Sequence, residues 1–231
     1  MLDFSRFETL TFDCYGTLID WESGILASMQ RIFSRHGARI DDAMILAHYG
    51  EFEAEAESGA FQPYREVLRS VVRQFGEKFK FTPSAEEERA LAASLPSWRP
   101  WPDTVAALQQ LKTRFRLAIL SNVDDDLFAG TRPQLKVDFD QVITAGQACA
   151  YKPSTEIFEL GLERIKTPAH RVLHVGQSIY HDVIPAQALG LATVWVNRPS
   201  RRAGVGAVKS ATAQPDLTVS SLEQLAAAAL R

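Results

Sequence analysis

An aspartate followed closely by glycine and threonine is the first group in this sequence that could do chemistry. Asp13 ends a short apolar run that begins at Leu10, and Gly16 and Thr17 follow shortly afterwards. Such a run is typical of a buried strand that ends at a sharp turn. Because reactive groups in open α/β sheets lie beyond the carboxyl ends of strands, Asp13 is a candidate nucleophile. Aspartate is also common as a turn or capping residue, so the motif by itself leaves both interpretations open.

Further polar groups follow later apolar runs or precede a helix in a similar way. They are Ser121, Asn122, Lys152 and Asp182. The carboxyl ends of parallel strands meet at one edge of a sheet, so we expect these side chains around one cleft with Asp13. A hydroxyl, an ammonium and a second carboxylate beside the first form a set suited to covalent catalysis.

Each member of this set has a plausible chemical role. Asp13 could attack a substrate and form an ester, while Lys152 could keep it ionised and stabilise charge in the transition state. Thr17 and Ser121, with backbone amides after Asp13, could orient the carboxylate and bind an anion. Asp182 could hold Lys152 in place or help to activate the hydrolytic water.

The elements that must position these groups alternate between strand and helix. After the run that ends at Asp13, strands are predicted over 117–120, 142–143, 172–175, 192–196 and 217–219. Helices are predicted over 103–111 with Asp103 as the cap, over 155–165 and 183–189, and after a capping box of Ser220 and Glu223. This alternation predicts an α/β fold, a Rossmann-like parallel sheet core with helices on both faces. Residues 198–214 are predicted to form a surface loop.

One helical block interrupts the alternation after the first strand. Helical spacing of apolar residues predicts helices over 25–36, 41–57 and 64–76, and Ser84 with Glu87 forms a capping box that opens a fourth. Prolines then punctuate the chain as a hinge would. We therefore predict a catalytic core of residues 1–20 and 99–231, with an inserted helical cap domain of residues 21–98. Such a cap can close over a small substrate and exclude water.

Composition excludes several classes of partner. The 231 residues carry a net charge of −3, which provides no basic field for nucleic acid or for a membrane surface. Only two cysteines are present, which suits a reducing compartment, and no apolar run approaches the length of a membrane span. With no signal-peptide pattern at the start, the expected location is cytoplasmic.

Taken together, the motifs resemble those of the haloacid dehalogenase superfamily over nearly the whole chain. The motifs, in order, are Asp13-x-x-Gly16-Thr17-Leu18, Ser121-Asn122, Lys152-Pro153 and Asp182. The helical block occupies the position of the family's cap. The resemblance implies a hydrolase that uses Asp13 as its nucleophile.

Within the superfamily, Tyr15 makes the chain most similar to the type II L-2-haloacid dehalogenases. The superfamily's phosphatases carry an aspartate at this position, as acid and base for the leaving group, and paired acids near Gln177 that hold magnesium. A halide needs no protonation, and a site without those acids would lose much of its charge for magnesium. The resemblance implies hydrolysis of short (S)-2-haloalkanoic acids to 2-hydroxy acids through an ester of Asp13, without a cofactor.

Two other functions stay open at this point. One is a Mg²⁺-dependent phosphatase that acts on a small phosphate ester, with Asp13, Asp182 and the main-chain oxygen of Tyr15 at the metal. The other is a non-catalytic binder that has retained the fold, although an intact Asp13 and Lys152 argue against it.

Substrate contacts are expected from the cap and from the neighbours of the motifs. Where the family's dehalogenases use a cap arginine, an alignment without gaps gives His48, which is only partly charged at neutral pH. Arg65 could supply the missing carboxylate clamp instead. The expected substrate-binding residues are Cys14, Tyr15, Asn122, His48, Tyr49, Phe61, Arg65 and Ser178. The expected partner is a small molecule, a 2-halocarboxylate, and family analogy suggests a homodimer.

Overall fold

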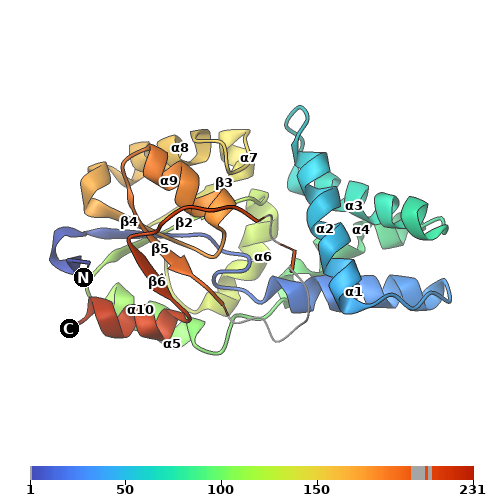
Figure 1. Cartoon of the computed structure of the whole chain (residues 1–231), viewed down its shortest axis with the longest axis horizontal. Helices are drawn as coiled ribbons and strands as arrows, with labels where there is room; N and C mark the ends of the chain where they lie inside the picture. Colours follow the sequence, from blue (N-terminus) through green and yellow to red (C-terminus); the bar gives the residue numbers. More distant parts are fainter. Residues whose placement is uncertain (1, 199–205, 208–209) are drawn as a thin grey trace.

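The chain folds into a six-stranded parallel sheet covered by helices, with a separate group of helices beside it (Figure 1). The computed structural model describes residues 2–198, 206–207 and 210–231. The strands are β1 Thr9–Phe12, β2 Arg116–Ser121, β3 Gln141–Thr144, β4 Val172–Gly176, β5 Ala192–Val196 and β6 Leu217–Val219. Their order in the sheet is β3-β2-β1-β4-β5-β6. The predicted Rossmann-like α/β core is confirmed.

Strand β1 lies at the point where the direction of strand addition reverses. It pairs with β2 on one side and with β4 on the other, both in parallel. The chain therefore adds β2 and β3 on one side of β1 before it crosses to β4. Ligand crevices in open α/β sheets form at such switch points. The residue that follows β1, Asp13, is thus placed at the mouth of the crevice.

Helices cover both faces of the sheet, so its strands are apolar on both sides. The helices α5 Thr104–Lys112 and α10 Leu222–Ala229 lie on one face, and α7 Ala145–Ala148, α8 Glu156–Ile165 and α9 Ile184–Ala188 lie on the other (Figure 1). All four residues of β1 are buried. A sheet buried on both faces needs near-continuous apolar strands, which explains the short apolar runs of the sequence.

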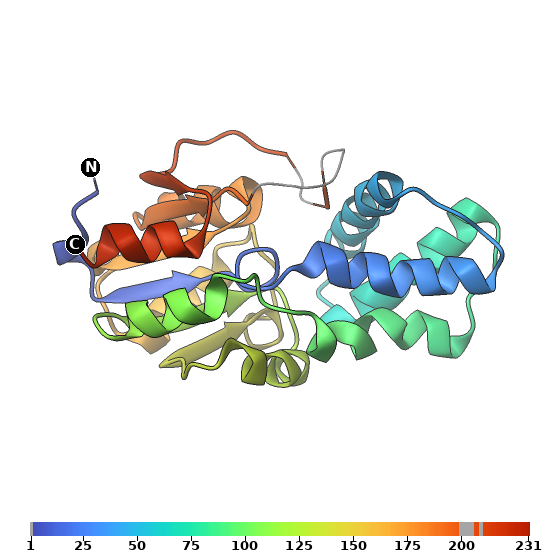
Figure 2. The ribbon, with the colours of Figure 1, turned by 90° about the horizontal axis from the view of Figure 1, so that it is seen from below.

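Helices α1 to α4 form the group that stands apart from the sheet in both views (Figures 1 and 2). They span Trp21–Arg35, Asp42–Glu57, Tyr64–Phe79 and Ala85–Ser94. The ring of Phe33 packs edge to face against Phe75 and Phe79, with ring centroids 5.6 Å apart in both pairs. Ser84 and Glu87 form the predicted capping box at the start of α4. In the described part of the chain no helix is long and apolar enough to span a membrane.

The prediction that the third cap helix stops near Gly76 is wrong, because α3 continues to Phe79. A Cβ at Gly76 would lie 2.7 Å from the carbonyl oxygen of Phe81 and 2.8 Å from Pro83. The glycine therefore permits a close approach of the returning chain. The helix ends one turn later, where Lys80 adopts a φ of 61°.

Helix α6, Asp125–Leu135, was not predicted because it contains Gly130 and Pro133. Both residue types usually mark turns or breaks. A Cβ at Gly130 would lie 2.8 Å from Pro96, so the glycine again serves a close contact between segments. Pro133 lies in the last turn of the helix, so the backbone hydrogen bond that it removes is close to the helix end.

Asp103 stands at the N-cap position of α5, as predicted, but its side chain makes no capping hydrogen bond to that helix because the carboxylate serves other partners. It accepts hydrogen bonds from Arg198 at 2.7 and 2.9 Å and from the backbone amide of Leu222 at 2.6 Å. The aspartate therefore satisfies the start of the C-terminal helix, α10. The capping residue of that helix is Ser221, paired with Gln224, rather than Ser220 with Glu223. Most of the predicted loop over 198–214 lies outside the described residues.

Replacing Asp103 with alanine is expected to destabilise the core. The Arg198 and Asp103 side chains are only 7% and 15% exposed, so the change leaves a buried guanidinium unpaired. We expect the free energy of unfolding to fall by about 3 kcal/mol, measured by urea denaturation. Asp138→Ala is the matched control, because Asp138 forms an exposed ion pair with Arg132 and should change stability little. Equal losses in the two variants would contradict this assignment.

Candidate active site

The side chain of Lys152 lies between two buried carboxylates at the carboxyl edge of the sheet. Its ammonium donates to Asp13 Oδ1 at 2.8 Å and to Asp182 Oδ1 at 2.6 Å. A third hydrogen bond, 3.1 Å long, goes to the carbonyl oxygen of Leu120. The Lys152 side chain is 1% exposed, so the three partners take the place of water around the charge.

Lys152 shares its charge between Asp13 and Asp182, and the pKa values of the two carboxylates shift in opposite directions. Burial would lower the pKa of Lys152, but the attraction of Asp13 and Asp182 outweighs it and raises that pKa above its ordinary value. Burial would raise the pKa of Asp182, but Lys152 and a hydrogen bond from His174 hold it well below its usual range. For Asp13, burial dominates and raises the pKa, although Lys152 opposes the shift. Asp182 is therefore the carboxylate that stays ionised beside Lys152, and Asp13 has the higher proton affinity of the two.

Thr17 fixes the orientation of the Asp13 carboxylate. Its hydroxyl donates to Asp13 Oδ2 at 2.6 Å and accepts a hydrogen bond from the backbone amide of Gln177 at 2.8 Å. The intervening Gly16 has a φ of 99°, and a Cβ there would lie 2.6 Å from the Gln177 side chain. The Gly-Thr pair thus lets the chain turn tightly and brings a donor back to the nucleophile.

Asp182 is held by a chain of buried groups that the sequence analysis missed. The ring of His174 lies 3.4 Å from Asp182 Oδ1 and 2.9 Å from the hydroxyl of Thr11. The backbone amide of Ser178 donates to Asp182 Oδ2 at 3.1 Å. His174 stands inside an apolar strand, where a single histidine is inconspicuous. A Cβ at Gly176 would lie 2.4 Å from the Asp182 carboxylate, which explains the glycine that ends β4.

Asn122 and Ser121 have different functions although they are adjacent. The Asn122 amide accepts from the backbone N–H of Lys152 at 2.8 Å and donates to its carbonyl oxygen at 3.1 Å. It therefore clamps the backbone that carries the lysine. The Ser121 hydroxyl is buried and has no hydrogen-bond partner among the described residues. Because buried hydroxyls are normally paired, Ser121 is available to a ligand.

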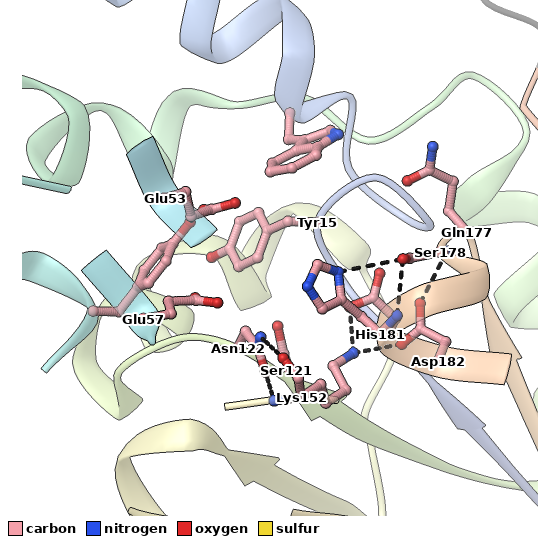
Figure 3. Close-up of a pocket in the computed structure, with 13 residues that line it drawn as sticks. Tyr15, Glu53, Glu57, Ser121, Asn122, Lys152, Gln177, Ser178, His181 and Asp182 are labelled. Carbon is pink, nitrogen blue, oxygen red and sulfur yellow. Dashed lines mark hydrogen bonds and ion pairs between the residues drawn. The ribbon is translucent and has the colours of Figure 1, made fainter. Parts of the chain in front are cut away.

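These residues line a pocket of about 490 Å³, part of it open to solvent (Figure 3). The core provides the floor, made of the carboxylates and ammonium already described together with Ser121, Asn122, Gln177, Ser178 and His181. Helices α1 to α3 provide the opposite wall, made of Trp21, Glu53, Glu57 and Tyr64. Figure 3 shows Glu53 and Glu57 across the pocket from the group formed by Lys152, His181 and Asp182.

Most of the motif residues come together as expected, but several expected substrate contacts do not line this pocket. Asp13, Tyr15, Ser121, Asn122, Lys152, Ser178 and Asp182 line it, and Thr17 lies directly behind Asp13. The expected contacts that do not line it are Cys14, His48, Tyr49, Phe61 and Arg65. Cys14 is fully buried in the hydrophobic core, and burial raises the pKa of its thiol well above the ordinary value.

The cap residues among them have other partners. His48 stacks on Phe52 with ring centroids 5.5 Å apart and hydrogen-bonds to Glu51 at 2.9 Å. Phe61 packs against Tyr151. Arg65 binds two core acids, Asp124 and Asp126, and thereby ties α3 to the start of α6. Tyr49 lies behind the pocket wall, where it donates to Glu53.

Sequence reasoning missed Glu53 and Glu57 because the end of α2 resembles a solvated acidic face. A signal was nevertheless present: both residues follow Tyr49 at intervals of four, on the helix face that carries buried Ile45 and Leu46. Acids at such positions face the interior of a helical lobe or the crevice beside it.

Comparison with known protein families supports the identification of these motifs. The model of the haloacid dehalogenase-like hydrolase family matches residues 7–190, and the chain belongs to this family of hydrolases. The resemblance inferred from the motifs is therefore confirmed.

Similar proteins include both dehalogenases and a nucleotidase. The chain is 26% identical over 199 residues to haloacetate dehalogenase H-2 of Moraxella sp. (strain B), covering 84% of this chain and 87% of that protein. It is 28% identical over 154 residues to pyrimidine 5'-nucleotidase YjjG of Escherichia coli (strain K12), covering 65% and 66%. The structure of an L-2-haloacid dehalogenase from Xanthobacter autotrophicus shares the fold, with a TM-score of 0.80 at 21% identity over 96% of this chain and 97% of that one.

Replacing Lys152 with methionine is expected to destabilise the protein in a pH-dependent way. Without the ammonium, Asp13 and Asp182 are two buried like charges, so the loss at about pH 7.5 should be about 3–5 kcal/mol. Their pKa values in the folded variant would lie above those of the unfolded chain. The loss should therefore shrink as the pH falls to about 5 and a proton is taken up. Urea denaturation at both pH values measures this.

Two further variants make the experiment specific. Lys152→Met combined with Asp13→Asn should recover part of the lost stability, because only one carboxylate then needs a counter-ion. Lys78→Met, at an exposed position of α3, should have little effect at either pH. A loss that is the same at both pH values would show that packing, and not the charge pair, explains the destabilisation.

Proposed function

We propose that this hydrolase cleaves the carbon–halogen bond of a short (S)-2-haloalkanoic acid through a covalent ester on Asp13. The observation that carries the proposal is the pairing of a buried, oriented Asp13 with Tyr15 at the position where an acid would be needed to protonate an alkoxide. The hydroxyl of Tyr15 lies 2.8 Å from Thr131 in helix α6. Burial also raises its pKa well above the ordinary value, which makes it a poor proton donor.

The first step is a displacement at carbon. An oxygen of Asp13 bonds to the carbon that carries the halogen, the carbon–halogen bond breaks, and its electron pair leaves with the halide. The configuration at that carbon is inverted. Lys152 lies within hydrogen-bond distance of Asp13 and holds its charge and orientation before attack. The Ser121 hydroxyl, which has no partner among the described residues, donates to the substrate's carboxylate.

The second step regenerates the nucleophile. Water attacks the carboxyl carbon of the Asp13 ester, so the oxygen of the water stays on Asp13 and the 2-hydroxy acid leaves with the original aspartate oxygen. One proton is released for each turnover. Lys152 stabilises the charge that develops on the ester oxygens, and Asp182 keeps the lysine in place throughout.

The donor set fits a magnesium-dependent phosphatase poorly. Magnesium requires several oxygen ligands in a near-octahedral arrangement. Both Asp182 oxygens already accept hydrogen bonds, from Lys152 and from the amide of Ser178, and Tyr15 and Gln177 replace the acids of the phosphatases. Among the described residues, no group of three or more histidines, cysteines and acids could hold a metal ion. We therefore do not propose a step that uses a metal.

The proposal is tested with 2-chloropropionate in heavy-oxygen water that contains a chelator. Wild type should release chloride and accumulate heavy oxygen in the peptide that contains Asp13, because water attacks the ester carbon. Asp13→Asn should release no chloride above the background rate. Asp138→Asn, a change of the same type at an exposed site, should release chloride at the wild-type rate.

Two results would overturn this proposal. Label found in the product alone would mean that water attacks the substrate directly. Chloride release by neither protein, together with phosphate release that appears on addition of magnesium to wild type, would favour the phosphatase.

The hydroxyl of Tyr15 is expected to contribute little to the rate. A general acid is worth at least about a hundredfold, so Tyr15→Phe should retain halide release within about tenfold of wild type if no proton is delivered from this position. Steady-state halide release at saturating substrate measures the effect, with Tyr180→Phe as a second tyrosine variant outside the pocket lining. If the rate of halide release fell a hundredfold in Tyr15→Phe but not in Tyr180→Phe, the assumption that the leaving group needs no proton would be contradicted.

We further propose that residues 21–98 act as the cap of this site and that residues 1–20 and 99–231 form its catalytic core. The contacts of Trp21, Glu53 and Glu57 with the pocket support this division. A homodimer and a cytoplasmic location stay predictions.

A further inference from the structure

The cap side of the pocket is acidic, whereas a group that binds the carboxylate of a substrate would have to be basic. Glu53 and Glu57 belong to the last turns of α2 and line the pocket together with Trp21 and Tyr64. Figure 3 shows both carboxylates pointing from the cap toward the core. Neither glutamate belongs to the motif set used above for bond cleavage.

Glu53 is held in place as a hydrogen-bond acceptor. The hydroxyls of Tyr49 and Tyr64 both donate to its Oε1 atom, at 2.9 and 2.6 Å. Tyr49 and Tyr64 are themselves buried, at 0% and 4% exposure. Because both donors meet one oxygen, Oε2 of Glu53 stays open to a partner on the pocket side. A carboxylate supported in this way is prepared to accept a further donor.

Glu57 lies one helical turn further along and has no hydrogen bond or ion pair with any residue that the structure describes. Burial, together with repulsion from Glu53, raises its pKa well above the ordinary value. Burial also raises the pKa of Glu53, to about 7. Among the described residues, no basic side chain forms an ion pair with either of these neighbouring acids, so their mutual repulsion is opposed only by the more distant charge of Lys152.

The described basic groups near the pocket are already engaged. Lys152 binds Asp13 and Asp182, His181 lies 3.3 Å from the hydroxyl of Ser178, and Arg65 binds acids outside the lining. At the other end of the same pocket, the Ser121 hydroxyl is buried without a partner among the described residues. This hydroxyl indicates that a ligand contacts the core end of the pocket, and the two glutamates line the same pocket on its other side.

We propose that Glu53 and Glu57 bind a cationic nitrogen at the end of the substrate remote from the reacting carbon. The ligand class is an alkylammonium, whose N–H groups reach the two carboxylates while its chain lies along the rings of Trp21 and Tyr15. Aromatic faces stabilise such cations in addition to the carboxylates. Trp21 is held by an edge-to-face contact with Tyr49, with ring centroids 5.8 Å apart.

Combined with the proposed function, on which this part rests, the site selects a zwitterionic substrate. The carboxylate of the 2-halo acid lies toward Ser121, the reacting carbon faces Asp13, and an ammonium group on the side chain meets the glutamates. Simple haloacids would then be poor substrates because they leave the acidic wall without a counter-ion.

Equilibrium binding tests the cation site without any turnover. Isothermal calorimetry with butylammonium, 1-butanol and butyrate compares a cation, a neutral molecule and an anion on the same chain. Wild type should bind butylammonium on the order of tenfold or more tightly than the other two. Glu57→Gln should remove this preference, and Glu55→Gln, which removes the same charge from an exposed position of α2, should keep it.

A second variant and a turnover comparison complete the experiment. Glu53→Gln should also reduce the preference, but it can disturb the tyrosine pair, so Glu57→Gln, with no described partner to lose, is the decisive change. For halide release, 2-chloro-5-aminopentanoate should be preferred over the isosteric 2-chlorohexanoate in wild type, and this preference should fall on the order of tenfold in Glu57→Gln.

The two proposals can fail separately. Butylammonium binding that depends on Glu57, in a protein that releases no halide, would support the cation site and overturn the dehalogenase function. Undetectable butylammonium binding, butyrate binding of equal strength, or an unchanged preference in Glu57→Gln would overturn the cation site even if Asp13 releases halide from haloacids.

Discussion

The structure of this active site depends on one buried ammonium placed between two carboxylates. Lys152 reaches Asp13 and Asp182 from a segment just before α8, while Asp13 directly follows β1 and Asp182 lies in the helical turn Ile179–Val183 after β4. A charge this deeply buried is tolerated only if all its partners are in place. The surrounding details follow from that requirement: Asn122 clamps the lysine backbone, and His174 and the Ser178 amide hold Asp182.

The same cluster gives the two buried carboxylates different protonation behaviour, which supports the proposed role of Asp13 as nucleophile. One cation cannot neutralise two acids equally, and the additional hydrogen bonds to Asp182 make it the stronger acid of the pair. Asp13 keeps the higher proton affinity, while Thr17 holds its second oxygen. In the proposed mechanism, Asp13 therefore cleaves the bond while Asp182 compensates the charge of Lys152.

In the proposed function, bond cleavage and substrate selection depend on different parts of the chain. The core side of the pocket consists of residues that family motifs specify, whereas the cap side consists of residues on α1 to α3 that no motif constrains. A cap that is separate from the sheet can change the polarity of its wall without disturbing the nucleophile. The acidic wall of Glu53 and Glu57 is a case in which the cap differs from what the core motifs suggest.

Several features were determined by the sequence alone. Apolar runs that end in Asp13 and Ser121 predicted buried strands that deliver polar groups to one edge, because parallel sheets covered on both faces have that pattern. Short-range capping chemistry was equally visible at Ser84 and Glu87. These inferences rest on local spacing, which the chain carries with it in any fold.

Only the tertiary structure decided the rest, because those features depend on which distant segments meet. Gly76 and Gly130 lie inside helices, and each lets another backbone or ring approach closely. The Asp103 carboxylate accepts a hydrogen bond from the first residue of a helix more than a hundred residues away. His48 and Glu53 lie on one helix, yet packing turns the histidine onto Phe52 and the glutamate into the pocket. Local spacing places residues on helix faces, but the face that meets the substrate is chosen by how the cap packs on the core.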